Sequence, residues 1–261
     1  MMKKPNLNIS IVQSDLIWHD KSSNLHKMDS FIQKIEDDTD LVILPEMFSS
    51  GFTMDSAGMA ESMRGDTVKW MIEKAVENKC AISGSLVITD SDRFYNRHLF
   101  IHPDGSIDFY DKKHLFRMAD EHKYYSPGNQ RVVVKYKGWR IMLLTCYDLR
   151  FPVWSRSRND YDVLIYVANW PEKRRQAWIT LLAARAIENQ AYVIGVNRVG
   201  MDGNQINYSG DSAVIDPKGD FISNIRPYVE GIDNINLDLE SLQEFRKSFP
   251  VRLDADEFEV L

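Results

Sequence analysis

The sequence contains very little cysteine: only Cys80 and Cys146 in a chain of 261 residues. Secreted proteins that depend on disulfides carry a denser cysteine framework, so this sequence argues against that class and for a reducing compartment, the cytoplasm. With two distant cysteines there is no Cys-x-x-Cys pair, and we expect no bound metal.

Long apolar runs, glycine-rich loops and an excess of positive charge are also absent. No apolar run is long enough to span a bilayer, and the N-terminal stretch lacks the apolar core of a signal peptide. There is no phosphate-binding or dinucleotide-binding glycine motif. The chain has 32 basic and 38 acidic residues, a net charge of -6, which argues against generic binding to nucleic acid or anionic membranes.

The composition that remains is that of a globular protein. Hydrophobic residues make up 44% of the chain and charged residues 27%. No repeat or linker interrupts it, so we expect a single domain over residues 1–261. Apolar runs and helical periodicities alternate along the chain, which predicts an α/β layered fold with helices outside. We expect strands at 139–145 and 221–225 and helices at 66–78, 173–190 and 239–248.

The most informative stretch is LLTCYDLRFP, residues 143–152. An apolar run that ends at Thr145 predicts a buried strand, so Cys146 follows the strand's carboxyl end. Open α/β sheets present their chemistry at that end, which favours a nucleophilic thiol. A buried structural cysteine is the alternative interpretation.

Three charged residues complete a candidate catalytic group with Cys146. Glu46 follows the short apolar run DLVIL, Lys112 lies in YDKKH, and Glu121 lies in the polar loop ADEHKYY. A carboxylate can take the proton of a thiol, and a lysine can stabilise the oxyanion that forms when the thiol attacks an amide. The backbone N–H of Tyr147 is the second expected oxyanion donor. A Cys–His pair with His114 or His122 is the competing arrangement.

These segments resemble the nitrilase, or carbon–nitrogen hydrolase, superfamily. The resemblance rests on LVILPEMF, YDKKHLF, LTCYDLRFP, ANWP, ARAIENQAYVIGVNRVG and GDSAVIDPKGD in this order. It implies a four-layer α-β-β-α sandwich, with Glu46 as general base and acid, Lys112 as oxyanion stabiliser, Cys146 as nucleophile and Glu121 as an assisting residue. The family pattern Lys-x-His selects Lys112 over Lys113. The resemblance further implies no cofactor, a structural role for Arg150 and a homodimer or higher homo-oligomer.

Within this superfamily the sequence looks most like the omega-amidases, which hydrolyse the side-chain amide of 2-oxoglutaramate or 2-oxosuccinamate. Such a substrate carries a carboxylate, so we expect cations and aromatic walls in its pocket. The candidate substrate-binding residues are Phe48, Arg117, Tyr124, Trp170, Arg174 and Arg175. A nitrilase, an N-carbamoyl hydrolase, a broad aliphatic amidase and a non-catalytic binding protein remain as alternatives.

Overall fold

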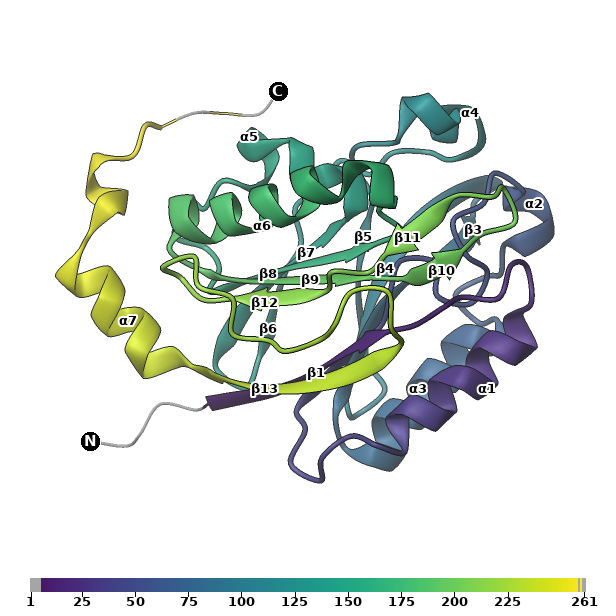
Figure 1. Cartoon of the computed structure of the whole chain (residues 1–261), viewed down its shortest axis with the longest axis horizontal. Helices are drawn as coiled ribbons and strands as arrows, with labels where there is room; N and C mark the ends of the chain where they lie inside the picture. Colours follow the sequence, from purple (N-terminus) through teal and green to yellow (C-terminus); the bar gives the residue numbers. More distant parts are fainter. Residues whose placement is uncertain (1–5, 258, 260–261) are drawn as a thin grey trace.

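The computed structural model describes residues 6–257 and 259, and two stacked β-sheets form its centre (Figure 1). The first sheet has the strand order β13-β1-β2-β3-β4-β5 and the second the order β12-β9-β8-β7-β6. Helices α1 and α3 pack on the outer face of the first sheet, and α5 and α6 lie over the second. The predicted α-β-β-α sandwich is confirmed.

The two sheets are built from short strands, most of them eight residues or fewer. Their bounds are β1 Asn6–Gln13, β2 Leu41–Ile43, β3 Ala81–Asp90, β4 Arg93–Ile101, β5 Ile107–Asp111, β6 Val133–Tyr136, β7 Trp139–Thr145, β8 Val163–Ala168, β9 Tyr192–Asn197, β12 Ala213–Ile215 and β13 Gly231–Asp238. Strands β10 (Val199–Met201) and β11 (Asn207–Ser209) form a separate hairpin.

The helices connect or follow these strands. The longer ones are α1 Lys21–Ile32, α3 Asp66–Asn78, α6 Arg175–Asn189 and α7 Leu239–Ser248. The shorter ones are α2 Ser56–Met59, α4 Glu121–Tyr124 and α5 Pro152–Ser155, with 3-10 helices η1 Arg117–Ala119, η2 Cys146–Arg150, η3 Glu172–Arg174 and η4 Val251–Asp254. No helix in the described part of the chain is long and apolar enough to cross a membrane.

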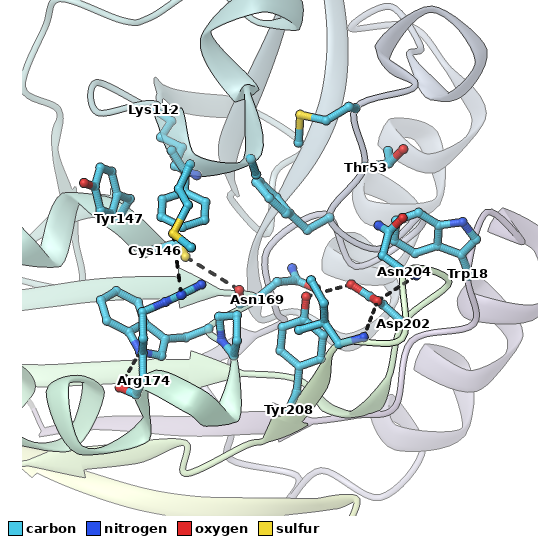
Figure 2. Close-up of a pocket in the computed structure, with 18 of the residues that line it drawn as sticks. Trp18, Thr53, Lys112, Cys146, Tyr147, Asn169, Arg174, Asp202, Asn204 and Tyr208 are labelled. Atoms are coloured by element: carbon cyan, nitrogen blue, oxygen red, sulfur yellow. Dashed lines mark hydrogen bonds between the residues drawn. The ribbon is translucent and has the colours of Figure 1, made fainter.

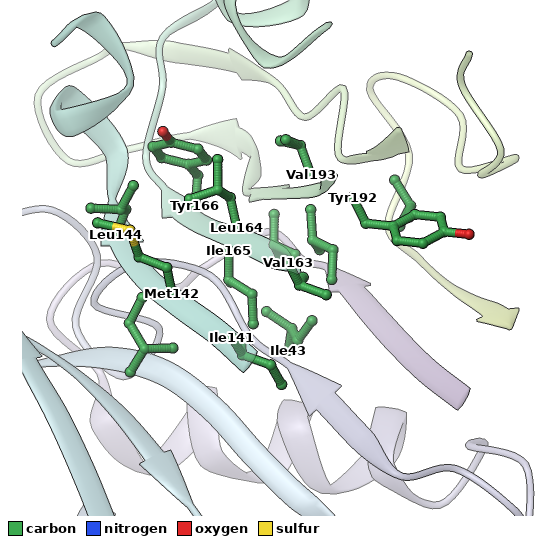
Figure 3. Packing of buried hydrophobic residues seen from close by; sticks show 14 of the residues in the cluster. Ile43, Ile141, Met142, Leu144, Val163, Leu164, Ile165, Tyr166, Tyr192 and Val193 are labelled. Carbon is green, nitrogen blue, oxygen red and sulfur yellow. The ribbon is translucent and has the colours of Figure 1, made fainter. Parts of the chain in front are cut away.

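Alternation along the strands divides the hydrophobic core. In β2, Leu41 and Ile43 belong to the cluster between the sheets, whereas Val42 belongs to the cluster under α1 and α3. Successive strand residues point to opposite faces, so a three-residue apolar strand can serve both layers. Figure 3 shows Ile43 among Ile141 and Ile165 of the opposing sheet. This apolar core packs the two sheets against each other.

Parallel pairing aligns strand ends in both sheets. Strands β1, β2 and β3 run parallel in the first sheet, and β7, β8 and β9 run parallel in the second. Parallel strands have their carboxyl ends at one edge, where α/β folds bind ligands. The segments after β2, β7 and β8 therefore supply the candidate site.

Most of the predicted elements are present, with two differences. The strand at 139–145 and the helices at 66–78 and 239–248 have the predicted bounds, and the helix predicted at 173–190 is η3 followed by α6. The strand predicted at 221–225 is wrong, because Phe221 makes only an isolated bridge with Ile215 and remains 48% exposed. Hairpin β10–β11 was not predicted, since its strands have only three residues each.

Close packing between α6 and β9 generates a stability prediction. A Cβ atom on Gly195 would lie 2.5 Å from Leu182 Cδ1 and 2.8 Å from Trp178 Cζ2. Because this core has no room, we expect Gly195→Ala to lower the free energy of unfolding by about 1–3 kcal/mol in urea titrations. The control is Gly231→Ala, whose Cβ would meet Ile225 at 3.7 Å, an ordinary contact. Equal stability of the two variants would contradict the prediction.

Candidate active site

Five polar residues converge beside the strand ends. Glu46 follows β2 by three residues, Lys112 follows β5 directly, Cys146 follows β7 and Asn169 follows β8. Glu121 is the first residue of α4. All five side chains are buried, with Cys146 the most accessible at 9%. Residues far apart in sequence thus share one small volume.

Lys112 lies between two carboxylates. Its Nζ donates to Glu46 Oε1 at 2.9 Å and to both Glu121 oxygens at 3.0 Å, and all three side chains are fully buried. Burial alone lowers the pKa of Lys112, but the charges of Glu121 and Glu46 outweigh it and hold the pKa above its usual value. The lysine is therefore a permanent cation.

Glu121 is held in place by the segment that precedes it. Its Oε2 accepts the Phe116 N–H at 2.5 Å, in addition to the Lys112 contact. Burial raises the pKa of Glu121, although Lys112 opposes the shift. Two buried carboxyl groups share one ammonium, so further hydrogen-bond donors are needed to stabilise the cluster.

Asn96 of β4 is such a donor, and sequence reasoning missed it. Its Nδ2 donates to Glu46 Oε1 at 2.7 Å and lies 3.5 Å from Glu121 Oε1. Ser85 Oγ donates to Asn96 Oδ1 at 2.8 Å and accepts the Met47 N–H at 2.9 Å. Asn96 is one of several polar residues in its strand, so the sequence offers no signal that singles it out.

Glu46 also contacts Asn169, the residue that follows β8. Strand β8 lies beside β7, which ends just before Cys146. Glu46 Oε2 accepts the Asn169 N–H at 2.7 Å, and Asn169 Nδ2 donates to the Glu46 carbonyl at 2.5 Å. The Asn169 carbonyl oxygen lies 3.9 Å from Cys146 Sγ (Figure 2). Glu46 is thereby tied to the strand end beside Cys146.

Cys146 begins η2 in an unusual backbone conformation. Its φ is +44°, in the left-handed region that residues with a Cβ rarely adopt. Strained backbone of this kind persists where surrounding contacts enforce it, and it clusters at functional sites. Burial, and then the charge of Glu46, raises the pKa of the Cys146 thiol well above its usual value. The resting thiol is therefore neutral and needs a base.

Asp148 enforces the turn at Cys146. Its Oδ2 accepts the Thr145 N–H at 3.0 Å and the Tyr110 hydroxyl at 2.8 Å. Its Oδ1 accepts the His114 N–H at 3.0 Å and contacts His114 Nδ1 at 2.7 Å. One fully buried carboxylate thus ties the chain before Cys146 to β5 and to the segment after Lys112.

A cavity of about 520 Å³ opens onto Cys146 and Lys112. Figure 2 shows Lys112, Cys146 and Tyr147 at one end of the view, and Trp18, Asp202 and Asn204 at the other. Aromatic and apolar side chains form most of the wall, together with a few charged groups; the lining residues include Phe52, Met54, Phe116, Met118, Arg150, Trp170, Pro171, Arg174, Ile206 and Tyr208. The cavity is a mostly apolar pocket with a reactive end.

The expected Tyr147 N–H lies in the first turn of η2. The first N–H groups of a helix lack partners inside the helix, so this group is free of the helical hydrogen-bond pattern.

His114, a candidate for the alternative Cys–His pair, instead binds Asp148 and stacks on Phe151 at 3.8 Å between ring centroids. Neither His114 nor His122 is among the described residues that line the cavity.

The structure brings two of the six predicted substrate-binding residues, Trp170 and Arg174, to the cavity. The other four predictions require correction. Phe48 is fully buried in the core under α1 and α3. Arg117 of η1 and Tyr124 of α4 are exposed, and Arg175 binds Asp211 through two hydrogen bonds of 2.7 Å. Sequence position alone did not indicate which way these side chains point.

Arg150, Phe52 and the residues of the β10–β11 hairpin also line the cavity. The resemblance implies a structural role for Arg150, and the structure places this residue in the cavity wall. The hairpin contributes Asp202, Asn204, Ile206 and Tyr208. Its strands are too short for periodicity to reveal them, so this wall could not be predicted from the sequence.

The Asp148 contacts generate a second prediction. Asp148→Asn replaces one acceptor oxygen with a donor that faces existing donors, so we expect a loss of about 3 kcal/mol in the free energy of unfolding. Urea titration at pH 7 measures it. The matched control is Asp108→Asn, because Asp108 also binds a histidine, His102, but its side chain is 49% exposed. Losses of similar size in both variants would contradict the prediction.

Comparisons with known proteins agree with this geometry. Omega-amidase YafV of Escherichia coli is 48% identical over 254 residues, covering 97% of this chain and 98% of that protein. The 2-oxoglutaramate amidase of Bacillus subtilis is 32% identical over 248 residues, covering 93% and 95%.

Solved structures show the same fold. XC1258 of Xanthomonas campestris, described as a CN-hydrolase superfamily protein with an arsenic adduct in its active site, has a TM-score of 0.96 and 43% identity, covering 98% of this chain and all of that one. Nit3 of Saccharomyces cerevisiae, a nitrilase-superfamily member, has a TM-score of 0.83 and 26% identity, covering 94% and 95%. Residues 8–247 match the carbon-nitrogen hydrolase family, and the chain belongs to that family.

Proposed function

We propose that this protein is a thiol-dependent omega-amidase that hydrolyses the terminal amide of 2-oxoglutaramate or 2-oxosuccinamate. The observation that carries the proposal is the buried Glu46–Lys112–Glu121 group beside Cys146 in a cavity. The omega-amidases and the 2-oxoglutaramate amidase among its relatives support the choice of substrate. The proposal treats residues 1–261 as one hydrolase domain without a cofactor.

The first step is attack of Cys146 Sγ on the amide carbon. The raised pKa of the thiol means that a base must take its proton as the C–S bond forms. Glu46 fills that role, because its charge already acts on the thiol and its carboxylate is fixed by Lys112, Asn96 and the Asn169 N–H. The product is a tetrahedral adduct with an oxyanion.

The oxyanion is stabilised by positive charge and by a backbone donor. Lys112 Nζ supplies the charge, and Glu121 holds the ammonium in place at 3.0 Å. The Tyr147 N–H supplies the hydrogen bond. Donors that are fixed before the reaction stabilise developing charge without reorganisation.

Breakdown of the adduct releases ammonia. Glu46 returns the proton to the amide nitrogen as the C–N bond breaks, which leaves an acyl thioester on Cys146. Water then attacks the thioester while Glu46 takes its proton. As the C–S bond breaks, Glu46 returns that proton to the sulfur, which gives the carboxylic acid and the free thiol. One carboxylate thus acts as base and then as acid in each half of the reaction.

The proposal extends to assembly and location. A homodimer through the face near α5 and α6 is consistent with Val153 and Ile187, which are 56% and 55% exposed there. The cytoplasm suits a reaction that needs a reduced thiol.

The substrate prediction is tested by ammonia release from five compounds side by side: 2-oxoglutaramate, succinamate, glutamine, a carbamoyl-amine and a simple nitrile. We expect the highest kcat/KM for 2-oxoglutaramate. Preference for the nitrile or the carbamoyl-amine would replace the amidase proposal with a nitrilase or carbamoylase. Cys146→Ala must abolish the activity, and unchanged turnover in that variant would overturn the thioester mechanism.

The position of the lysine generates a further prediction. We expect Lys112→Met to lower kcat by at least about 1,000-fold, because the oxyanion loses its cation. Lys113→Met is the matched control, since Lys113 Nζ instead lies 5.2 Å from the Trp154 ring centroid. Circular dichroism checks that both variants fold. A larger loss from Lys113→Met would assign the role to the neighbouring lysine.

A further inference from the structure

The imidazole of His98 is fully buried between the two sheets, yet the proposed mechanism does not use it. His98 lies in β4, two residues before Phe100, which belongs to the apolar cluster between the sheets. Residues two apart in a strand share a face, so the imidazole points into the same layer. A polar ring in such a place costs free energy unless its nitrogens have hydrogen-bond partners. The partners of His98 therefore indicate what the ring does.

Each nitrogen of the His98 ring has one partner. Nδ1 lies 3.0 Å from the Leu144 carbonyl oxygen, and Nε2 lies 2.8 Å from Ser83 Oγ. A carbonyl can only accept, so Nδ1 carries the proton and Nε2 accepts from the Ser83 hydroxyl. Burial lowers the pKa of His98 to about 3, which keeps the ring neutral. Both nitrogens are occupied and His98 is not among the described residues that line the cavity, so it is not the base for the thiol.

The Leu144 carbonyl lies two residues before the nucleophile. Leu144 is in β7 and packs in the core between the sheets (Figure 3), whereas His98 belongs to the other sheet. The hydrogen bond from His98 thus joins the sheet that carries Glu46 to the end of the strand that carries Cys146. A hydrogen bond in an apolar core does not compete with water, so it is stronger than the same bond at the surface.

A second pair of residues in the same two strands holds the base. Asn96 precedes His98 by two residues in β4, so both side chains point to the same face of the sheet. Asn96 donates to Glu46 Oε1 at 2.7 Å and accepts from Ser85 Oγ at 2.8 Å, as His98 accepts from Ser83 of the same strand. Strand β4 therefore contacts the base through one residue and the strand of the nucleophile through another.

We infer that His98 is a positioning residue, which holds Cys146 at the correct distance from Glu46 through the Leu144 carbonyl. The inference rests on the proposed thioester mechanism and adds to it the group that aligns the nucleophile with its base. Loss of this hydrogen bond would let the end of β7 shift, and a displacement of about 1 Å can lower a rate about 100-fold. Substrate binding would change little, because His98 does not line the cavity.

The test measures the reaction of Cys146 with iodoacetamide, which requires no turnover of a substrate. Sγ forms a bond to the methylene carbon, iodide leaves with the electron pair of the C–I bond, and the thiol proton passes to Glu46. Peptide mass spectrometry follows the labelling of each cysteine separately. Cys80 is fully buried, so slow labelling of Cys80 shows that a variant remains folded.

Three substitutions of His98 separate its two ring nitrogens. In His98→Asn the side-chain nitrogen occupies the δ position, as Nδ1 does, and can still donate to the Leu144 carbonyl. In His98→Gln the nitrogen is one bond farther out, and His98→Leu has no donor. We expect His98→Leu and His98→Gln to slow the labelling of Cys146 about 10- to 100-fold, and His98→Asn to stay within about 3-fold of wild type. Ser83→Ala, a milder change, leaves Nδ1 in place but removes the group that fixes the tautomer, so we expect an intermediate loss.

The matched control is His102→Leu, because His102 directly follows β4 but binds the half-exposed Asp108 instead of β7. We expect it to label Cys146 at the wild-type rate. Wild-type rates in His98→Leu and His98→Gln would overturn the inference. Equal losses in all three His98 variants, or rapid labelling of Cys80 in them, would also overturn it, because the ring would then only stabilise the fold.

Turnover of 2-oxoglutaramate gives a second readout. We expect His98→Leu to lower kcat about 10- to 100-fold with KM within about 2-fold of wild type, because the alignment of the thiol changes but the cavity does not. A loss that lies wholly in KM would contradict the positioning role. If wild type hydrolyses no amide but the labelling differences hold, the proposed function fails and the positioning role stands. If wild type is active but the His98 variants label and turn over normally, the positioning role fails and the proposed function stands.

Discussion

The contact on which the site depends is one buried ammonium shared by two buried carboxylates. Lys112 without Glu46 and Glu121 would be an unpaired charge in the core, and either carboxyl group without the lysine would lack its cationic partner. Two carboxyl groups share one ammonium, and Asn96 and the Asn169 N–H add further donors to Glu46. A network of this kind is stable only when every member has its partner, which explains why it is also rigid.

Rigidity matters here because the nucleophile is not activated in advance. Burial and a nearby carboxylate keep the Cys146 thiol protonated, so its reactivity requires a base held at the correct position. The left-handed backbone at Cys146, enforced by the four contacts of Asp148, fixes the thiol, while the lysine fixes the base. The stacked sheets hold these two groups together, since β2 and β7 belong to different sheets.

The cavity has the catalytic candidates at one end and the β10–β11 hairpin at the other. Its reactive end contains the Glu46–Lys112–Glu121 cluster beside Cys146, whereas Arg150 and Arg174 stack on aromatic rings. The β10–β11 hairpin closes the opposite wall with polar groups that already bond to one another.

The sequence by itself determined the layered α/β class, the strand before Cys146 and the candidacy of Glu46, Lys112 and Glu121, because apolar runs that end in polar residues are local signals. Tertiary structure alone decided which side chains reach the cavity. Arg117, Tyr124, Arg175 and Phe48 were plausible by type and position, yet the first two are exposed, Arg175 binds Asp211 and Phe48 is buried. Arg150 and Asn96 join the site through contacts between distant segments, and no local pattern encodes where such segments meet.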